Sequence, residues 1–247
     1  MSTEAVTYES RNNIAIITMN RAASMNRLDS AMVDALHHQW KRFMAGTDRV
    51  AILTGDGTKA FCAGADLNAV PHDLYRGIPD IGVPVDKPVI AAVSGWCIGG
   101  GMVLTTMCDL LVATEDAKFS YPEVKIAFSG GLITTLASRI PHKIAMELLL
   151  LGDTIDARRA YEVGYVNRIV ATDKLMPTAM TMANTLADMA PMPSRMLKRF
   201  VSQTIPKGPS EQAAIARVQI EAVNDSADWV EGRQAFLEKR APQFNGE

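Results

Sequence analysis

Four short apolar runs in the first half of the chain have the pattern of buried β-strands. Each consists almost entirely of small and branched apolar residues, without the alternation expected of a strand that exposes one face to water. Such runs are typical of parallel strands that other elements cover on both sides. These strands are predicted over residues 14–19, 50–54, 89–93 and 110–113.

Helical spacing of apolar residues appears between these runs. A helix is predicted to begin near Asp29 or Ser30, because either side chain can cap the first turn. The residues that fall on one face of this helix, and that we expect to be buried, are Val33, Leu36, Trp40 and Phe43. A second helix, buried on all sides, is predicted after Gly101.

The second half of the chain is dominated by helical patterns. From about residue 132 onward, Pro141 separates one pair of helices, and a methionine-rich helical segment covers residues 176–196. Two further helical patterns lie between residues 210 and 240. Strands followed by helices predict an α/β core with a helical C-terminal region. No low-complexity linker separates two independent domains.

The composition is that of an ordinary globular protein. Of 247 residues, 48% are hydrophobic and 21% are charged, which argues against disorder, and the formal net charge is −2. Basic residues are scattered, so we expect neither nucleic acid nor an anionic membrane as a partner. The first ten residues lack the pattern of a secretory signal, and no apolar run is long enough to span a bilayer.

The three cysteines, Cys62, Cys97 and Cys108, make a poor disulfide framework because their number is odd and their spacing irregular. They fit a reducing compartment, and we expect the protein to be cytoplasmic. No base is identifiable beside Cys62 or Cys97, so the thiols are interpreted as small buried apolar groups. No spacing of cysteine and histidine suggests zinc, and no metal is expected.

Two glycine-rich segments imitate nucleotide-binding motifs. Residues 55–60 follow a predicted strand and fit a loose GxGxxA pattern, but the residues after them are a poor helix start. A tight turn between two short strands explains these glycines better. Residues 95–100 have the glycine spacing of a phosphate-binding loop, yet Gly101 and Met102 stand where that loop needs lysine and a hydroxyl residue. We reject both nucleotide interpretations.

The more informative run is KPVIAAVSGWCIGGG at 87–101, in which three glycines directly precede a predicted helix. A helix N-terminus presents unpaired N–H groups and a partial positive charge, and glycine lets a ligand oxygen approach them. This arrangement suits a developing oxyanion. Close packing of the helix against a strand explains the glycines about equally well. A second run, FCAGADL at 61–67, also leaves N–H groups accessible, and Asp66 can cap a following turn.

Together the two runs resemble the crotonase superfamily, which is the enoyl-CoA hydratase/isomerase family. The resemblance continues through CDLLVATEDAKFSYPE at 108–123, AYEVGYVNRIV at 160–170 and FLEKR at 236–240, and so covers nearly the whole chain. It implies a spiral of ββα units over residues 1–190, with the acyl-CoA site, and a helical trimerisation region over residues 191–247. It also implies an oxyanion hole made by the N–H groups of Ala65 and Gly100.

The chain departs from the family pattern at one of its two glutamate positions. Family hydratases carry a glutamate two residues after the glycine triplet and another twenty residues later, which correspond here to Val103 and Glu123. Valine cannot activate water, whereas one glutamate can move a proton between carbons of an enolate. The resemblance to enoyl-CoA isomerases therefore favours double-bond isomerisation. A hydratase, lyase or decarboxylase with a different second acid or base remains the alternative, as does a non-catalytic acyl-CoA-binding subunit.

The resemblance also implies how CoA is bound. It assigns contacts to Arg27, to three residues of the first run, and to two residues near the C-terminus that would reach a neighbouring subunit: Arg27, Ala63, Asp66, Leu67, Phe236 and Lys239. Phe236 and Lys239 are expected on one face of the last helix. We expect no permanently bound cofactor, because CoA arrives as part of the thioester, and a homotrimer or a dimer of trimers.

Two segments that shape the acyl pocket in the family differ in this chain. The stretch from Asp66 to Lys87 is shorter than usual, and residues 124–131 lack the usual GxxPGxGG. Polar residues in or beside these segments could supply a missing acid, although each is more often a loop or packing residue: Tyr121, Ser129, His72 and Tyr75.

Overall fold

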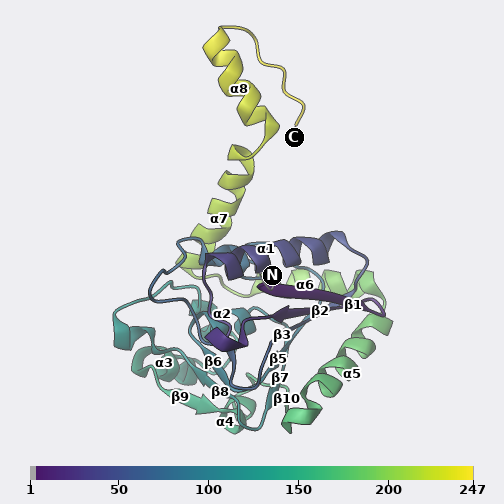
Figure 1. Cartoon of the computed structure of the whole chain (residues 1–247), viewed down its shortest axis with the longest axis vertical. Coiled ribbons are helices and arrows are strands. Elements are labelled where there is room, and N and C mark those ends of the chain that lie inside the picture. Colours follow the sequence, from purple (N-terminus) through teal and green to yellow (C-terminus); the bar gives the residue numbers. More distant parts are fainter. Residues whose placement is uncertain (1–3, 247) are drawn as a thin grey trace.

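A computed structural model describes residues 4–246 of the chain (Figure 1). Its larger sheet has six strands in the order β1-β2-β3-β5-β7-β10, and all neighbours are parallel except the β1–β2 pair. The strands are β1 (Val6–Arg11), β2 (Ile14–Met19), β3 (Val50–Gly55), β5 (Val89–Val93), β7 (Leu110–Thr114) and β10 (Arg168–Val170). The four strands predicted from apolar runs are confirmed.

A smaller sheet has the order β4-β6-β8-β9, with the last strand antiparallel to its neighbour. Its strands are β4 (Ala60–Cys62), β6 (Trp96–Ile98), β8 (Lys118–Ser120) and β9 (Thr154–Asp156). Three times, a strand of the large sheet is followed along the chain by a strand of the small sheet, as in β3–β4, β5–β6 and β7–β8. Repetition of this unit gives the predicted spiral of ββα type. The turn between β3 and β4 contains the rejected GxGxxA pattern.

The helices of the spiral are α1 (Ser30–Ala45), α2 (Gly100–Thr106), α3 (His142–Leu151), α4 (Ala157–Glu162) and α5 (Leu175–Asp188). Short 3₁₀ turns cover Ala22–Ser24, Leu74–Gly77, Pro122–Ile126, Thr134–Ser138 and Thr172–Lys174. Helix α1 begins where the sequence predicts, since Oδ1 of Asp29 accepts a hydrogen bond from the N–H of Met32 at 2.8 Å. Helix α2 is buried along its whole length.

Both faces of the large sheet are covered, which explains why its strands lack polar alternation. One face of the large sheet packs against α1, α2 and the small sheet. Together they form the main core around Trp40, Phe43 and Phe61. The other face packs on α5, in which Leu175, Ala179, Ala183 and Ala187 recur every four residues and bring the helix close to the strands.

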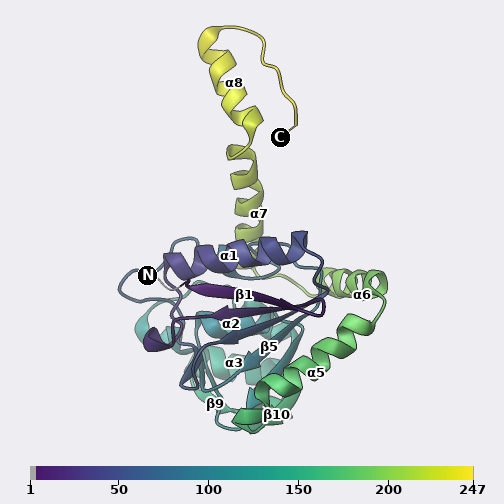
Figure 2. The same cartoon turned by 45° about the vertical axis from the view of Figure 1, so that its right-hand side comes forward.

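The last three helices are α6 (Pro191–Thr204), α7 (Pro209–Asn224) and α8 (Ala227–Glu238). Figures 1 and 2 show α6 against the body, α7 rising from it and α8 beyond α7. Large apolar side chains are exposed on α7 and α8, including Ile220, Val223, Val230, Phe236 and Leu237. Within the described residues 4–246, no helix is long and apolar enough to cross a bilayer.

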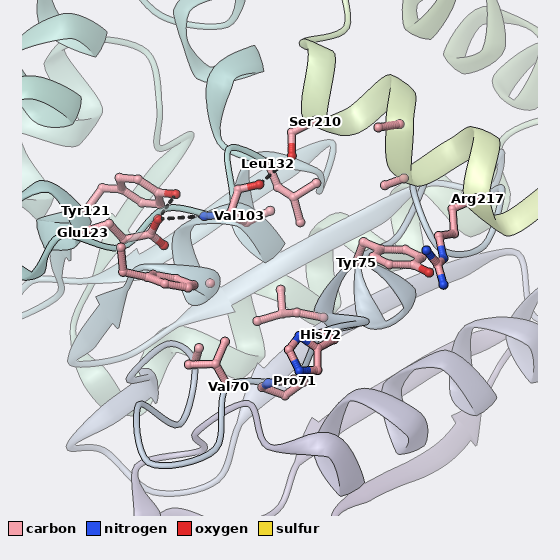
Figure 3. A pocket seen from close by; sticks show the side chains of 17 residues that line it. Val70, Pro71, His72, Tyr75, Val103, Tyr121, Glu123, Leu132, Ser210 and Arg217 are labelled. Carbon is pink, nitrogen blue, oxygen red and sulfur yellow. Dashed lines mark hydrogen bonds between the residues drawn. The ribbon is translucent and has the colours of Figure 1, made fainter.

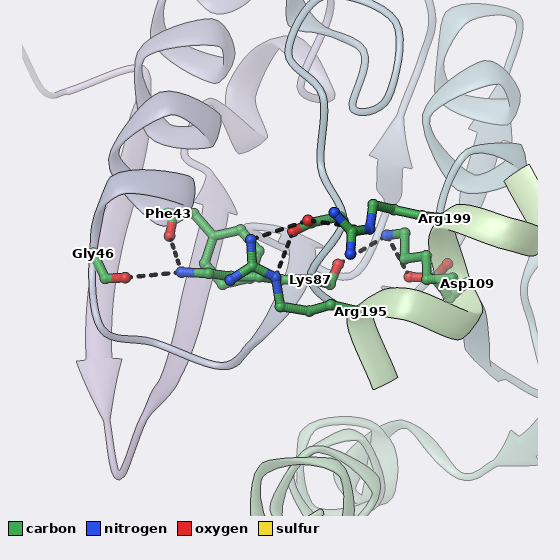
Figure 4. Close-up of polar contacts among 8 residues, drawn as sticks. Phe43, Gly46, Lys87, Asp109, Arg195 and Arg199 are labelled. Atoms are coloured by element: carbon green, nitrogen blue, oxygen red, sulfur yellow. Dashed lines mark hydrogen bonds and ion pairs between the residues drawn. The ribbon is translucent and has the colours of Figure 1, made fainter. Parts of the chain in front are cut away.

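Polar contacts hold α6 on the sheet next to strand β5 (Figure 4). Arg195 donates to both carboxylate oxygens of Asp86, at 2.8 and 3.0 Å. Nζ of Lys198 donates to Oδ2 of Asp109 at 2.7 Å and to the carbonyl of Lys87 at 2.8 Å. Because β5 leads into the glycine triplet and Asp109 follows α2, these contacts support both ends of the segment that carries the candidate site.

Candidate functional site

A cavity of about 390 Å³ lies where the N-terminus of α2, the segments 65–75 and 121–132, and the start of α7 meet (Figure 3). Its wall is mainly apolar, with a few polar groups of separate origin. The residues that line it are Ala65, Val70, Pro71, His72, Leu74, Tyr75, Gly100, Val103, Tyr121, Glu123, Phe128, Gly130, Leu132, Ser210, Ala213, Ala214 and Arg217. Apolar pockets with few convergent polar groups are the usual form of small-molecule sites.

Two backbone N–H groups on this wall are left without an acceptor by the way the chain folds. Leu28 forms a parallel bridge with Ala65 by bonding to the residues on either side of it, Gly64 and Asp66, so the N–H of Ala65 points away from Leu28. Gly100 is the first residue of α2, where an N–H has no partner inside the helix. Within residues 4–246, neither N–H meets an acceptor.

The glycines bring these two N–H groups together. A Cβ on Gly100 would lie only 3.8 Å from the nitrogen of Ala65, so the two residues are neighbours across the wall. Gly64 has φ +86°, and a Cβ there would lie 3.0 Å from the carbonyl oxygen of Ile98. Gly99 has φ +52°, a conformation that side chains disfavour. Glycine is therefore required for the turns that present the two donors.

The alternative explanation, close packing, applies to the last glycine of the triplet. A Cβ on Gly101 would lie 2.8 Å from the carbonyl oxygen of Cys62 on β4. Helix α2 therefore approaches the small sheet more closely than alanine would allow. Close packing thus explains Gly101, while the oxyanion role of the N–H of Gly100 stays a prediction.

Glu123 is the acidic group of the cavity. It lies in the 3₁₀ turn Pro122–Ile126 after β8 and is 8% exposed. Its Oε2 accepts hydrogen bonds from the hydroxyl of Tyr121 at 2.5 Å and from the N–H of Gly130 at 3.3 Å. Burial raises the pKa of the carboxyl above that of an ordinary glutamate, while Tyr121, Gly130 and the nearby Ser129 act in the opposite direction.

Val103 lines the same cavity and is buried on the first turn of α2. It faces the space where a second carboxylate would stand if the chain followed the two-glutamate pattern. Among the described residues 4–246, Glu123 is the only acidic side chain on the cavity wall. The site therefore offers two backbone donors for an oxyanion and one carboxyl group for proton transfer.

The other polar residues singled out in the sequence are partly brought together. Tyr121, His72 and Tyr75 lie on the cavity wall, and Ser129 is adjacent to Gly130 of the wall. Sequence reasoning missed Ser210 and Arg217 of α7, which close the cavity on its other side. The hydroxyl of Ser210 donates to the carbonyl of Gly130 at 2.5 Å, which joins α7 to the segment after Glu123.

A second cavity of about 180 Å³ adjoins the first. The two share Ala65, Gly100, Glu123 and Phe128, so the N–H pair and the carboxylate lie at their junction. The residues found only in the second cavity include Ala63 and Leu67, two of those predicted to contact CoA.

Asp66 stands in the chain between Ala65 and Leu67 of the second cavity, and its carboxylate is paired with Arg27. Nη1 of Arg27 is 3.3 Å from Oδ1 of Asp66, and the same oxygen accepts the N–H of Asn68 at 3.1 Å. Asp66 thus caps the turn that follows it, as expected from the sequence.

Phe236 and Lys239 are not brought to either cavity. Phe236 is 83% exposed on α8, which lies away from the body (Figure 1). The expectation that both residues share a face of the last helix is wrong, because α8 ends at Glu238 and Lys239 follows in the left-handed conformation with φ +54°. Their role in CoA binding stays a prediction.

The remaining sequence candidates have structural explanations. All three thiols are buried and free, and burial raises the pKa of Cys62 to about 12, which removes its nucleophilic form at neutral pH. Within residues 4–246, no group of three or more His, Cys, Asp or Glu side chains is arranged to hold a metal ion.

Comparisons with known proteins give relatives over nearly the whole chain. The model of a family described as enoyl-CoA hydratase/isomerase matches residues 9–247. The chain is 34% identical to a probable enoyl-CoA hydratase of Mycobacterium leprae, over 99% of both chains. It is 36% identical to the (E)-benzylidenesuccinyl-CoA hydratase of Thauera aromatica, over 98% of this chain and 99% of that protein.

A solved structure shows the same fold. The crystal structure of a probable enoyl-CoA hydratase/isomerase from Mycobacterium abscessus superposes with a TM-score of 0.76 at 34% identity, and the match covers 99% of this chain and all of that one. Sequence and fold agree over the whole length. The chain belongs to the enoyl-CoA hydratase/isomerase family, within the crotonase superfamily.

Proposed function

We propose that this acyl-CoA enzyme moves a carbon–carbon double bond by shuttling one proton, with Glu123 as its only acid/base group. The observation that carries the proposal is the combination on one wall, within residues 4–246, of two unpaired N–H groups, at Ala65 and Gly100, with a single buried carboxylate. Val103 fills the place of a second carboxylate with a methyl surface.

The thioester oxygen would accept hydrogen bonds from both N–H groups. These donors stabilise the negative charge that develops on the oxygen when a proton leaves the α-carbon. In a 3-enoyl thioester, the Glu123 carboxylate takes the α-proton, and the C–H electron pair enters a dienolate. The resulting carboxylic acid returns the proton to the γ-carbon, so the double bond ends between the α- and β-carbons and the carboxylate is regenerated.

The two adjoining cavities give the thioester a direction. The larger, mainly apolar cavity suits the acyl group, and the smaller cavity with Ala63 and Leu67 suits the start of the CoA arm. The reacting carbons then lie at the junction, next to Glu123. CoA needs no separate cofactor site in this arrangement, since it enters and leaves with the acyl group.

We further propose that Phe236 and Lys239 contact CoA on a neighbouring copy within a trimer or a dimer of trimers. Both residues are far from the cavities of their own chain, and α7 and α8 expose apolar side chains to solvent. Arg27 would add a phosphate contact if its ion pair with Asp66 opened.

The test is a panel of 3-enoyl and 2-enoyl CoA thioesters given to the native protein, Glu123→Gln and Glu211→Gln. Glu211 is a matched control, because it is buried and accepts a backbone N–H, that of Gly208, but lies outside the cavity wall. The proposal predicts conversion of 3-enoyl to 2-enoyl thioesters that Glu123→Gln loses and Glu211→Gln keeps. Isomerisation that survives in Glu123→Gln would overturn it.

Hydration is the second candidate, favoured by the names of the two relatives. It requires another group to hold the attacking water, and we take the Tyr121 hydroxyl, which lies on the wall and bonds to Glu123, as the candidate. Addition of water to the 2-enoyl thioesters of the same panel, without isomerisation of the 3-enoyl thioesters, would favour hydration. Binding of thioesters with no conversion of any would favour a non-catalytic subunit.

A further inference from the structure

The two oxygens of the Glu123 carboxylate have different surroundings. Oε2 accepts the hydroxyl of Tyr121 at 2.5 Å and the N–H of Gly130 at 3.3 Å. Among residues 4–246, both well-formed hydrogen bonds to the carboxylate are made to Oε2, and the hydroxyl of Ser129 lies beside the carboxylate as a further donor. A Cβ on Gly99 would lie 3.7 Å from Oε1, so this oxygen faces the turn that presents the N–H of Gly100.

We propose that Tyr121 is a positioning residue that holds Oε2 and thereby makes Oε1 the oxygen that carries the proton. This inference rests on the proposed function, since it assumes that Glu123 is the acid/base group. Tyr121 and Glu123 are two residues apart on either side of Pro122, at the entry to the 3₁₀ turn. Pro122 fixes its own φ near −65°, which limits the ways in which the two side chains can meet.

The burial of Tyr121 makes it a permanent donor. The residue is 3% exposed, and burial together with the hydrogen bond to Glu123 raises the pKa of the phenol, so the hydroxyl keeps its proton at neutral pH. A neutral phenol that donates to a carboxylate stabilises the charged form of that carboxylate. The hydrogen bond therefore offsets part of the effect of burial and keeps Glu123 able to act as a base.

Other ionisable groups are poorly placed to stabilise the charged form of Glu123. On the cavity wall, His72, Tyr75 and Arg217 lie away from Glu123 in Figure 3. Arg217 and Tyr75 are engaged with Glu221, at 3.1 and 2.8 Å. On the turn of Glu123 itself, Lys125 is exposed and paired with Asp153 at 3.4 Å. Ser129 places a further hydroxyl beside the carboxylate.

The test is the pH profile of kcat/KM for the native protein and Tyr121→Phe. A base must be deprotonated, so kcat/KM rises with pH through the pKa of Glu123. Loss of a hydrogen bond to the charged carboxylate raises that pKa, and the acid limb is expected to move to higher pH by about one to two units. The plateau at high pH is also expected to fall, because the carboxylate loses the contact that fixes the direction of Oε1.

Tyr8→Phe is the matched control. The Tyr8 hydroxyl donates to Oδ2 of Asp48 at 2.6 Å, a phenol–carboxylate bond of the same kind outside the cavity. This variant is expected to lower the melting temperature without moving the acid limb. If Tyr121→Phe moves the limb no more than Tyr8→Phe, or lowers kcat/KM equally at every pH, the positioning role is wrong.

Gly130→Pro gives an independent test if Tyr121→Phe fails to fold. It replaces the second donor to Oε2, the N–H of Gly130, with a proline ring carbon next to that oxygen, and the space around a Cβ at residue 130 is open. A smaller shift of the acid limb in the same direction is expected, and an unchanged limb would contradict the inference. If Glu123→Gln loses activity but neither Tyr121→Phe nor Gly130→Pro moves the acid limb, the role of Tyr121 is refuted and the proposed function stands. Full activity of Glu123→Gln refutes the proposed function.

Discussion

The N–H of Gly100 can be deleted without adding a polar or charged group to the cavity. Gly100 is the first residue of α2, the helical position at which proline is best tolerated, because the N–H there has no partner in the helix. Gly100→Pro removes the proposed oxyanion donor. Gly100→Ala adds a Cβ at the same place and keeps the N–H, so the two variants differ in the donor and in the ring carbon that proline bonds to the nitrogen.

The contacts of a Cβ at residue 100 show the steric strain that Gly100→Pro and Gly100→Ala share. A Cβ at residue 100 would lie 2.7 Å from Cδ1 of Leu28 and 3.8 Å from the nitrogen of Ala65. The first contact is too close, but it involves the end of a flexible side chain, and a Leu28→Ala background removes it from both variants. Loss of one preorganised donor costs about 2.7–4 kcal/mol of transition-state stabilisation, which is about 10²–10³ in rate.

The assay is kcat/KM of each variant with the best thioester of the panel, together with its melting temperature. Gly100→Pro is expected to fall about 10²–10³-fold below Gly100→Ala while both unfold at similar temperatures. Equal kcat/KM for the two folded variants would refute the assignment of Gly100 as an oxyanion donor. A large loss already present in Gly100→Ala would show that space, rather than the N–H, limits the reaction.

Three other predictions follow from individual contacts. Because burial raises the pKa of Glu123, kcat/KM of the native protein should rise with pH at values above those typical of an exposed glutamate, and a pH profile checks this. Lys198→Ala breaks the contacts of α6 with Asp109 and with the carbonyl of Lys87, and should cost about 1–2 kcal/mol, or a few degrees in Tm by calorimetry; an unchanged Tm would show that the contacts contribute nothing. With the pKa of Cys62 raised to about 12 by burial, a thiol reagent should modify Cys62 only after unfolding, and mass spectrometry of the native protein should find it unmodified.

Much of the fold could be predicted because long elements carry a repeated signal. The buried strands, the start of α1 and the pair of C-terminal helices each follow from residues close together in the chain. The strands of the small sheet have three residues each, too few for a hydrophobic period to appear. Lys239 ends α8 in a left-handed conformation that glycine or asparagine usually supplies, so the local indication of the end of that helix is Pro242, three residues later.

The candidate site, like the fold, could be predicted from the sequence only in part. The family resemblance indicated the N–H groups of Ala65 and Gly100 as donors, whereas the glycine-rich turns alone left close packing equally open. Arg217 closes the cavity from a helix more than ninety residues beyond Glu123, and only tertiary packing brings the two to one cavity. The Tyr121–Glu123 bond depends on the direction of two side chains in a 3₁₀ turn, which spacing alone does not determine.

Proton exchange at the α-carbon tests the central claim most directly, since it requires the oxyanion donors and Glu123 but no particular acyl product. The native protein would be incubated with an acyl-CoA in deuterated water, and incorporation at the α-carbon followed by NMR. The account predicts α-deuteration by the native protein and by Glu211→Gln, and none above background by Glu123→Gln. Equal exchange in Glu123→Gln, or none in the native protein with any thioester that binds, would contradict it.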